Sequence, residues 1–258
     1  MILSLVKELK IRKNEIQNTT IETIYFGGGT PSVLHVDELQ FLIDTIYEHY
    51  TVVKHPEITL EANPDDLSEE KIIQLSESPI NRLSIGIQSF FEKDLTLMNR
   101  AHNSHEAKKC LSIATQYFKN ISVDLIYGIP DCTNDQWREN IKIALSYGVP
   151  HISSYALTVE PKTALETLIN NGKIKKVHEQ KVASQFQILT EELQKADFVH
   201  YELSNFGKEG FFSKNNSSYW LGKPYLGIGP SAHSFDGKQR SWNVKNNTKY
   251  IKILGSYG

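Results

Sequence analysis

Short runs of β-branched and aromatic residues alternate along the chain with longer segments whose apolar positions recur at helical spacing. Residues 2–16 place apolar side chains among charged ones at this spacing, which predicts an opening helix. Ile21–Phe26 predicts a strand, Gly27–Pro31 a glycine-rich turn, and the segment from about Asp37 a second helix. A strand, a turn and a helix form the repeating unit of a parallel α/β sheet.

The same alternation continues to about residue 157. Later strands are predicted at Glu57–Glu61, Arg82–Ile87, Ile121–Tyr127 and His151–Leu157, with helices at Leu67–Leu75, from a cap at Ser104 onward, and at Asn134–Tyr147. Strands that alternate with helices in this way favour parallel pairing through right-handed crossovers. The sequence therefore predicts the α/β fold class, as a barrel, a partial barrel or a doubly wound sheet.

The pattern changes after about residue 160. A helix is predicted at Val177–Lys195, and a tract rich in glycine, serine, asparagine and aromatic residues follows it as far as Trp242. Because no linker rich in proline and serine separates this part from the rest, we expect it to pack on the preceding α/β segment. We predict two domains, residues 1–160 and 161–258, and expect Tyr250–Leu254 to begin a segment that continues beyond the given sequence.

The charge balance disfavours several classes of partner. The 28 lysine and arginine residues nearly match the 30 aspartate and glutamate residues, which gives a net charge of −2 without long runs of one sign. This balance offers no electrostatic basis for binding nucleic acid or an anionic membrane. No stretch approaches the ~18 consecutive apolar residues of a membrane span, and the N-terminus lacks a basic leader segment. We therefore predict a cytoplasmic protein with no nucleic-acid partner and no membrane span.

The carboxyl ends of the predicted strands are polar, and in parallel α/β folds this edge is where ligands bind. The glycines of Gly27–Gly29 lack Cβ atoms and permit positive φ, so a ligand with an amino or carboxylate group could approach the backbone N–H groups. The alternative is a tight turn between strand and helix. The spacing matches neither a dinucleotide-binding fingerprint nor a phosphate-binding P-loop.

Two acidic residues lie within otherwise apolar strands. Glu61 and Asp124 would each be costly to bury without a partner, and Arg100 is available as a counter-charge to either. A structural ion pair across the strand ends is the alternative to ligand binding. Because polar residues end several strands of the same predicted sheet, we favour a ligand site at this edge.

Several longer motifs follow one another in a distinctive order: Thr23–Ser32, Glu61–Pro64, Arg82–Phe90, Val123–Pro130, His200–Phe206 and Gly227–Phe235. With these motifs the sequence resembles the radical S-adenosylmethionine (radical SAM) family. The most similar branch contains the oxygen-independent coproporphyrinogen III oxidase-like proteins and the HemW-type haem chaperones. The resemblance implies a partial (β/α)6 radical-SAM barrel, here missing its first strand, with a C-terminal α+β extension.

The resemblance also implies a binding site for S-adenosylmethionine. By position, the residues that would line its amino-acid moiety and complete its pocket are Gly28, Gly29, Thr30, Glu61, Gln88, Arg100 and Asp124. Arg100 would bind the methionine carboxylate in a bidentate manner, and the acids suit the amino group and the ribose hydroxyls. We assign no catalytic residue and no metal ligand.

The sequence departs from the family at the cluster motif. Family members carry a Cys-x3-Cys-x2-Cys motif that binds a 4Fe-4S cluster, and this motif is absent from the sequence. Its place would precede the first helix, so we expect a chain truncated at its N-terminus, with a cluster-free relative as the alternative. We expect Cys110 in the core, on the apolar side of a helix, and Cys132 to be a surface thiol in a loop.

A second departure concerns haem. HemW-type relatives carry a His-Asn-x-x-Tyr-Trp motif linked to haem binding, and Asn215 stands where its histidine would be. An amide cannot replace an imidazole as a ligand to haem iron. His233 is the best remaining candidate, with a loop histidine bonded to backbone as the alternative. Nearby aromatic residues could wall a porphyrin or form core: Phe211, Phe212, Tyr219, Trp220 and Tyr225.

The favoured function is that of a HemW-like haem chaperone, which binds haem and passes it to an unidentified acceptor protein. When complete, it would also hold the 4Fe-4S cluster with S-adenosylmethionine. The alternative is an oxygen-independent coproporphyrinogen III dehydrogenase, which acts on a porphyrinogen through a 5′-deoxyadenosyl radical in porphyrin biosynthesis. A degenerate barrel with neither activity is the third interpretation. Enzyme activity stays open, because the chain as given lacks the thiolates that radical chemistry needs.

Overall fold

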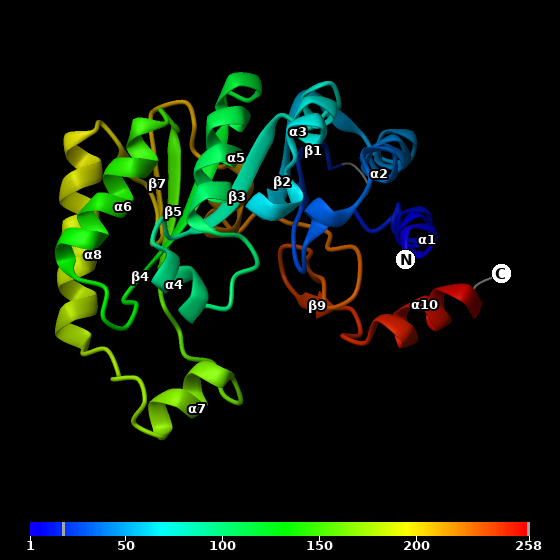
Figure 1. The fold of residues 1–258 in the computed structure, drawn as a ribbon. Helices are drawn as coiled ribbons and strands as arrows, with labels where there is room; N and C mark the ends of the chain where they lie inside the picture. Colours follow the sequence, from blue (N-terminus) through cyan, green and yellow to red (C-terminus); the bar gives the residue numbers. More distant parts are fainter. Residues whose placement is uncertain (17–18, 257–258) are drawn as a thin grey trace. The chain divides into compact units, whose positions relative to one another are not determined.

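The computed structural model describes residues 1–16 and 19–256 (Figure 1). Its main sheet runs in the order β1-β2-β3-β4-β5-β7-β6. The strands are β1 (Ile21–Phe26), β2 (Val52–Ala62), β3 (Arg82–Gln88), β4 (Ile121–Tyr127), β5 (His151–Ala156), β6 (Val199–His200) and β7 (Asn205–Gly207). Strands β2 to β5 pair in parallel, whereas β7 is antiparallel to both β5 and β6. The predicted α/β fold class is confirmed.

The chain forms two compact units. Unit 1 comprises Met1–Tyr25, Leu34–Ile58 and Ser213–Gly258, and unit 2 comprises Phe26–Val33 and Thr59–Phe212. Both units therefore draw on segments that are distant in the sequence. The domain boundary predicted near residue 160 stays a prediction.

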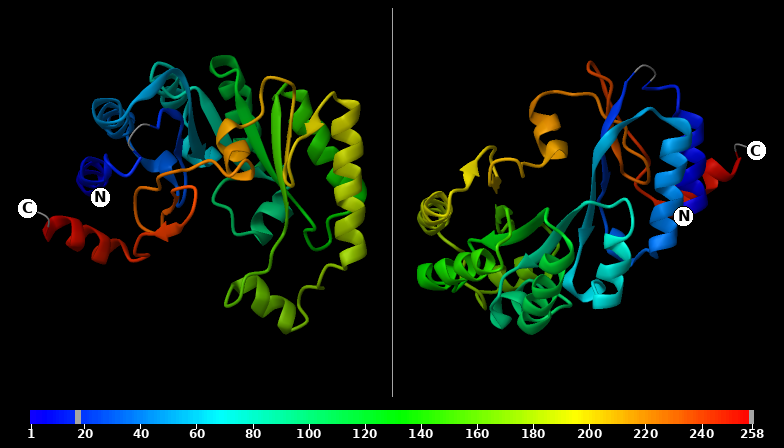
Figure 2. Two further views of the ribbon diagram at one scale, coloured as in Figure 1. Left: turned by 180° about the vertical axis from the view of Figure 1, so that it is seen from behind. Right: turned by 90° about the horizontal axis from the view of Figure 1, so that it is seen from above.

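Unit 2 consists of βα units and the helices that cover them. The helices are α3 (Glu69–Ser76), α4 (Glu92–Leu97), α5 (Ser104–Tyr117), α6 (Asn134–Ser146), α7 (Ala164–Asn170) and α8 (Glu179–Lys195). Helix α3 packs on α5, while α6 and α8 pack on each other and on β4; Figure 2 shows the green helices beside the green strands. Strand β3 is buried along almost its whole length, as expected for a parallel strand in the middle of a sheet.

The start of α5 differs from the prediction. Its cap is Asn103, whose side chain accepts a hydrogen bond from the Glu106 N–H, while the Glu106 carboxylate accepts one from the Asn103 N–H. Ser104 is instead the first helical residue, and its hydroxyl donates to the carbonyl of Phe90 over 2.6 Å. Asparagine and serine are about equally good caps, so the sequence alone could not choose between these neighbours.

The two cysteines are both buried. Cys110 lies in the core as predicted. The prediction that Cys132 is a surface thiol is wrong, because its side chain is 1% exposed. Helix α8 covers the loop that carries it, and Gln185 of that helix donates a hydrogen bond to the Cys132 carbonyl over 3.2 Å. The sequence places Cys132 in a loop, but it does not reveal that a helix about 50 residues later covers that loop.

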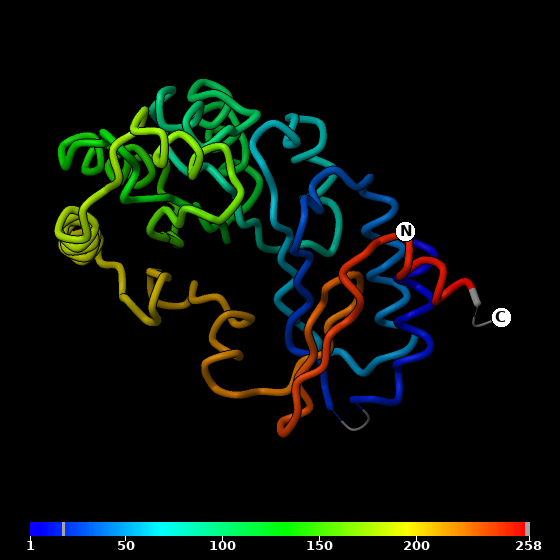
Figure 3. The backbone as a smooth tube through the Cα atoms, turned by 90° about the horizontal axis from the view of Figure 1, so that it is seen from below, coloured from blue at the N-terminus to red at the C-terminus, as the bar shows by residue number. Residues whose placement is uncertain are grey.

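Unit 1 contains α1 (Ile2–Arg12), α2 (Val36–His49), α9 (Lys214–Trp220), α10 (Asn247–Ser256), β8 (His233–Phe235) and β9 (Arg240–Trp242). Helix α1 packs on α2 and α10, and Figure 3 shows the red α10 beside the blue α1. The carboxylate of Glu8, which is 4% exposed, joins these segments. Its hydrogen-bond donors are Arg12 Nη1, the Gly229 N–H, Asn243 Nδ2 and the Tyr250 hydroxyl.

Within residues 1–16 and 19–256, none of the helices combines the length and the apolar character that crossing a lipid bilayer requires.

Candidate functional site

The glycine-rich loop after β1 has an open, left-handed backbone. Gly28 and Gly29 have φ values of +75° and +70°, which side chains with a Cβ rarely adopt. Apart from the adjoining residues of the loop, no atom of the described part of the chain lies within 4 Å of the position that a Cβ would take at either residue. The Gly28 N–H donates a hydrogen bond to Oε2 of Glu61, at the end of β2, over 3.1 Å. The loop thus has free space where side chains would project from Gly28 and Gly29, and its backbone is anchored to the Glu61 carboxylate.

Ser32 ties the same loop to the segment that follows β2. Its hydroxyl donates to Asp66 Oδ2 over 2.6 Å and accepts from the Asn63 N–H over 3.2 Å, and its carbonyl accepts from Lys71. The carbonyl of Thr30 accepts from the Val33 N–H and begins a short 3-10 turn at Pro31–Val33. Hydrogen bonds therefore hold both ends of the loop that contains Gly28, Gly29 and Thr30.

The end of β3 brings a third polar group to this edge. Gln88 has a φ of +65°, and the register of the β3–β4 pairing shifts between Ile85 and Gln88. A Cβ at Gly86 would lie 2.9 Å from Gln88 Nε2, 3.4 Å from Arg100 Nη2 and 3.5 Å from Asn63 Oδ1. The absence of a side chain at Gly86 thus lets these three polar groups converge.

Arg100 follows α4 and turns its guanidinium toward the same place. Its Nη2 donates to Asn63 Oδ1 over 2.7 Å. Its Nε is buried and has no hydrogen-bond partner among the described residues. A buried guanidinium N–H without an acceptor is costly, so it marks a position where a ligand oxygen would be favourable.

Asp124, in the middle of β4, faces this edge as well. Ser84 of β3 donates a hydrogen bond to its Oδ1 over 3.2 Å. Burial and the nearby negative charge of Glu61 raise the pKa of Asp124 to about 7, against the opposing effect of the Ser84 hydrogen bond. The cation that acts on Asp124 is Arg82, whereas Arg100, which was available as a counter-charge to either acid, donates to Asn63.

We group these residues, which come from the loop after β1, the ends of β2 and β3, the segment after α4 and the middle of β4, as the strand-end cluster: Gly28, Gly29, Thr30, Glu61, Gln88, Arg100 and Asp124. Two carboxylates that interact unfavourably suit a cationic group, and a guanidinium with an unused N–H suits an anionic one. The cluster therefore matches a ligand that carries both charges. Sequence reasoning did not single out Ser32, Asn63 and Ser84, although all three lie inside the motifs that carry the neighbouring site residues.

A second polar network lies on strands β4 and β5 of unit 2 and is largely buried. Ser122 Oγ is 2.7 Å from Nδ1 of His151, and Nε2 of His151 is 2.7 Å from the Tyr201 hydroxyl. Ser122 and His151 have no exposed surface, and burial lowers the pKa of His151 well below its usual range. The arrangement satisfies the buried polar atoms of Ser122 and His151.

The described residues offer no group of three or more His, Cys, Asp and Glu side chains suited to a metal ion. Burial raises the pKa of the Cys110 thiol to about 12 and that of Cys132 to about 11. Thiols held in this state are poor ligands, because iron and zinc bind the thiolate. Neither cysteine therefore provides a cluster ligand.

Comparison with known proteins identifies the family of this chain. A family model described as the radical SAM superfamily matches residues 4–144, which is more than half of the chain. The chain belongs to the radical SAM superfamily. The resemblance inferred from the motifs is thereby confirmed.

Two curated relatives illustrate its position within the superfamily. The "Heme chaperone HemW" of Mycobacterium tuberculosis is 33% identical over 254 residues, which cover 98% of this chain and 65% of the relative. The protein of the same name from Bacillus subtilis is 36% identical over 243 residues, covering 92% of this chain and 63% of the relative. The chain thus spans less than two thirds of the length of these relatives.

A solved structure establishes the architecture. Coproporphyrinogen III oxidase (HemN) from Escherichia coli, described as a radical SAM enzyme, matches 98% of this chain and 61% of its own, with a TM-score of 0.83 and 21% identity. At this identity the likeness concerns the fold alone. The radical SAM chain therefore has the partial (β/α) barrel fold that its motifs imply.

The region of the haem-linked motif lies in unit 1 of this radical SAM protein. Glu57, which is 6% exposed, accepts hydrogen bonds from the N–H groups of Lys214 and Asn215 over 3.1 and 3.0 Å and so caps α9. Tyr219 and Trp220, on the last turn of α9, are 51% and 65% exposed. Of the two alternatives for the aromatic residues, core packing is thus wrong for these two.

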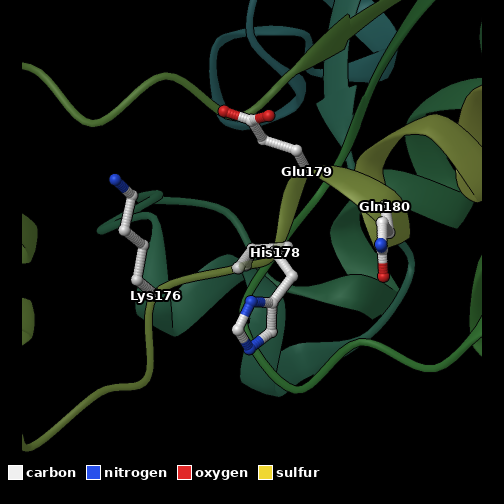
Figure 4. Close-up of a pocket in the computed structure, with 5 residues that line it drawn as sticks. Lys176, His178, Glu179 and Gln180 are labelled. Carbon is white, nitrogen blue, oxygen red and sulfur yellow. The ribbon is translucent and has the colours of Figure 1, made fainter.

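A shallow depression of about 440 Å³ lies elsewhere, lined by Lys176, Val177, His178, Glu179 and Gln180 at the start of α8. In Figure 4 the side chains of Lys176, His178 and Glu179 point in different directions. Because its polar groups do not converge, this depression has none of the features of the strand-end cluster.

Proposed function

We propose that this chain is the S-adenosylmethionine-binding part of a HemW-like haem chaperone. The observation that carries the proposal is the identity of 33–36% to proteins named heme chaperone HemW over at least 92% of this chain. The likeness to HemN, at 21% identity, supports only the shared fold. For this reason we place the chaperone before the coproporphyrinogen III dehydrogenase.

The strand-end cluster is where S-adenosylmethionine would bind. Gly28, Gly29 and Thr30 would line its amino-acid moiety, with the open left-handed backbone giving access to N–H groups. Arg100 would bind the carboxylate through its unused Nε–H. Glu61 and Asp124 would face the amino group and the ribose hydroxyls, and Gln88 would complete the pocket.

The positive charge of the ligand fits the electrostatics of these acids. Burial and the negative charge of Glu61 both disfavour the ionised form of Asp124 and raise its pKa to about 7. An ammonium or sulfonium group placed between the two carboxylates would favour the ionised form of both. Asp124 therefore would lose its proton when the cofactor binds at neutral pH.

The family implies a 4Fe-4S cluster beside S-adenosylmethionine, and the described residues do not fit one. Such clusters need closely spaced thiolates, whereas Cys110 and Cys132 are both buried with raised thiol pKa values. We therefore derive no radical step from this chain. Within the whole protein, we propose that a cluster is held by residues outside this sequence.

Haem is the proposed cargo, and an unidentified acceptor protein its recipient. The test is to add haemin to the purified chain and record the Soret band, and separately to titrate S-adenosylmethionine by calorimetry. Binding of both would support the proposal. A chain that leaves the haemin spectrum unchanged would exclude haem binding by this part of the protein. In the full-length protein, formation of 5′-deoxyadenosine that depends on coproporphyrinogen III would favour the dehydrogenase instead.

A further inference from the structure

The hairpin β8–β9 carries a row of ring side chains on one face. Antiparallel pairing sets His233 opposite Trp242 and Phe235 opposite Arg240. Tyr225 adds to the other side of β8 through two backbone hydrogen bonds with Phe235, of 2.8 and 2.9 Å. Because side chains alternate between the two faces of a strand and paired residues share a face, all five side chains lie on the same face. We call this the ring face.

The opposite face of the hairpin packs within unit 1. Ser234, which lies between His233 and Phe235 in β8, accepts hydrogen bonds from Arg12 Nη2 over 3.1 Å and from the Gly227 N–H over 2.9 Å. Ser234 is 7% exposed. The ring face therefore points away from α1, and His233 is exposed there.

The rings of this face make contacts in two groups. The imidazole of His233 and the indole of Trp242 have centroids 6.0 Å apart, and Tyr225 and Phe235 are 6.3 Å apart. Tyr219 of α9 extends the row, since its ring meets that of Tyr225 edge-on at 4.8 Å. Trp242 is nevertheless 66% exposed. Exposed aromatic side chains gathered on one face are a common feature of binding sites.

The backbone beneath His233 is fixed although its side chain is exposed. A Cβ at Gly227 would lie 2.0 Å from the carbonyl oxygen of His233, so only glycine allows the two segments to approach this closely. The imidazole is thus presented from a rigid position, which lowers the entropy cost of coordinating a ligand.

The ring face combines three chemical groups that suit one class of ligand. Imidazole nitrogen is a ligand for haem iron, aromatic rings pack on a flat porphyrin, and a guanidinium pairs with carboxylates such as the propionates. We propose that the ring face binds haem, with His233 as an axial ligand, Trp242 and Phe235 against the porphyrin, and Arg240 near a propionate. This inference rests on the proposed function and specifies where the cargo sits.

The inference explains how the chain can lack the histidine of the haem-linked motif. Asn215 cannot coordinate iron, and its backbone N–H is taken up by the cap that Glu57 provides for α9. Helix α9 would then contribute its exposed Tyr219 to the edge of the surface, while the imidazole comes from β8. The proposed iron ligand, His233 on β8, and the haem-linked motif on α9 are thus on different elements of unit 1.

The test is a haemin titration of the purified chain, followed by absorption and electron paramagnetic resonance spectroscopy. We expect the wild-type chain to give a shifted Soret band and the signal of an imidazole-ligated ferric haem. His233→Ala should lose that signal and weaken haemin binding about tenfold or more. His105→Ala, which removes an exposed histidine at the start of α5, and Asn215→Ala should both bind like wild type.

A second variant separates ligation from folding. In His233→Gly, added imidazole should restore the spectrum, because free imidazole can replace the missing iron ligand. It could not restore the spectrum of a misfolded variant. Trp242→Ala should weaken binding but keep the imidazole-ligated signal.

If wild type binds haemin and His233→Ala has the same spectrum and affinity, the ring face is not the site, although haem binding stands. If the wild-type chain binds no haemin, the ring face is not a haem site, while the S-adenosylmethionine titration still tests the proposed function. Concentration-dependent dimerisation that Trp242→Ala abolishes, without a Soret shift, would assign the face to a second copy of the chain.

Discussion

The backbone N–H of Gly28 and the carboxylate of Glu61 are joined by a hydrogen bond of 3.1 Å, which links the glycine loop to the end of β2. The bond gives Glu61 two separate roles. Its oxygen fixes the loop, and its negative charge acts on Asp124.

Substitutions at Glu61 separate these roles. Glu61→Gln keeps an acceptor for the Gly28 N–H but removes the charge, so we expect S-adenosylmethionine affinity to fall about tenfold with little change in thermal stability. Glu61→Ala removes both and should weaken binding further. Isothermal titration calorimetry and thermal melts measure the two effects. Equal affinity of Glu61→Gln and wild type would show that the carboxylate charge does not meet the cofactor.

The titration of Asp124 predicts a pH dependence of cofactor binding. Its pKa is about 7, through burial and the charge of Glu61, and a cationic ligand prefers the ionised carboxylate. Affinity for S-adenosylmethionine should therefore rise as the pH increases from about 6 to 8. Asp124→Asn should bind more weakly and lose this rise. A wild-type affinity that is flat over the same range would contradict the assignment of Asp124 to the pocket.

A substitution at Gly86 tests the convergence of Gln88, Arg100 and Asn63 without replacing any residue that we assign to the pocket. In Gly86→Ala the new Cβ would lie 2.9 Å from Gln88 Nε2 and displace the end of this flexible side chain, beside Arg100. We expect about tenfold weaker cofactor binding and a nearly unchanged urea midpoint. Gly255→Ala, where a Cβ meets no atom within 4 Å, is the matched control. Loss of folding in Gly86→Ala would instead point to a structural role of this glycine.

The cap that Glu57 provides for α9 predicts a stability effect in unit 1. Glu57→Leu leaves the N–H groups of Lys214 and Asn215 without their acceptor, which costs about 1–3 kcal/mol. Urea unfolding measures the loss. The control is Glu22→Leu, which breaks the exposed ion pair with Lys223 and should change stability by less than about 1 kcal/mol. Similar losses in both variants would contradict the role of Glu57 as a buried cap.

His151 predicts sensitivity to acid. Burial lowers its pKa in the folded state, so as the pH falls below about 6.5 the unfolded chain takes up a proton that the folded protein does not. The contribution of His151 to the free energy of unfolding is therefore complete at high pH. It is lost as the pH falls below the pKa of the histidine in the unfolded chain. We expect the urea midpoint to drop between pH 8 and 5.5, and to drop less in His151→Gln. The exposed His105→Gln should keep the wild-type drop; an unchanged drop in His151→Gln would refute the explanation.

Among the strands, β1 and β4 are predicted best, whereas β2 begins at Val52, before its predicted start at Glu57. The bounds of β1 and β4 match because runs of β-branched residues end there at glycine or turn residues. The opening helix was predicted to residue 16 and ends at Arg12, and the short helices α4 and α7 were missed, because few residues carry their periodic pattern. Ser104 was mistaken for the cap that Asn103 supplies.

The strand-end cluster was predicted only in part. Polar residues at strand ends drew attention to Glu61 and Asp124, and the resemblance added Gln88 and Arg100. The partners that hold them were not predictable, since Ser84 faces Asp124 only through the β3–β4 register, which pairs Ser84 with Ser122. The residues assigned to cofactor binding stay a prediction.

The carboxylate of Glu8 has a consequence for how the polypeptide matures during synthesis. Two of its hydrogen-bond donors, Asn243 and Tyr250, lie 235 and 242 positions further along the chain. While a ribosome is still translating the middle of the message, α1 has emerged but the groups that satisfy its buried acid have not been made. Unit 1 can therefore complete this hydrogen-bond network only late in translation, after Tyr250 has been made, whereas α1 can pack on α2 much earlier.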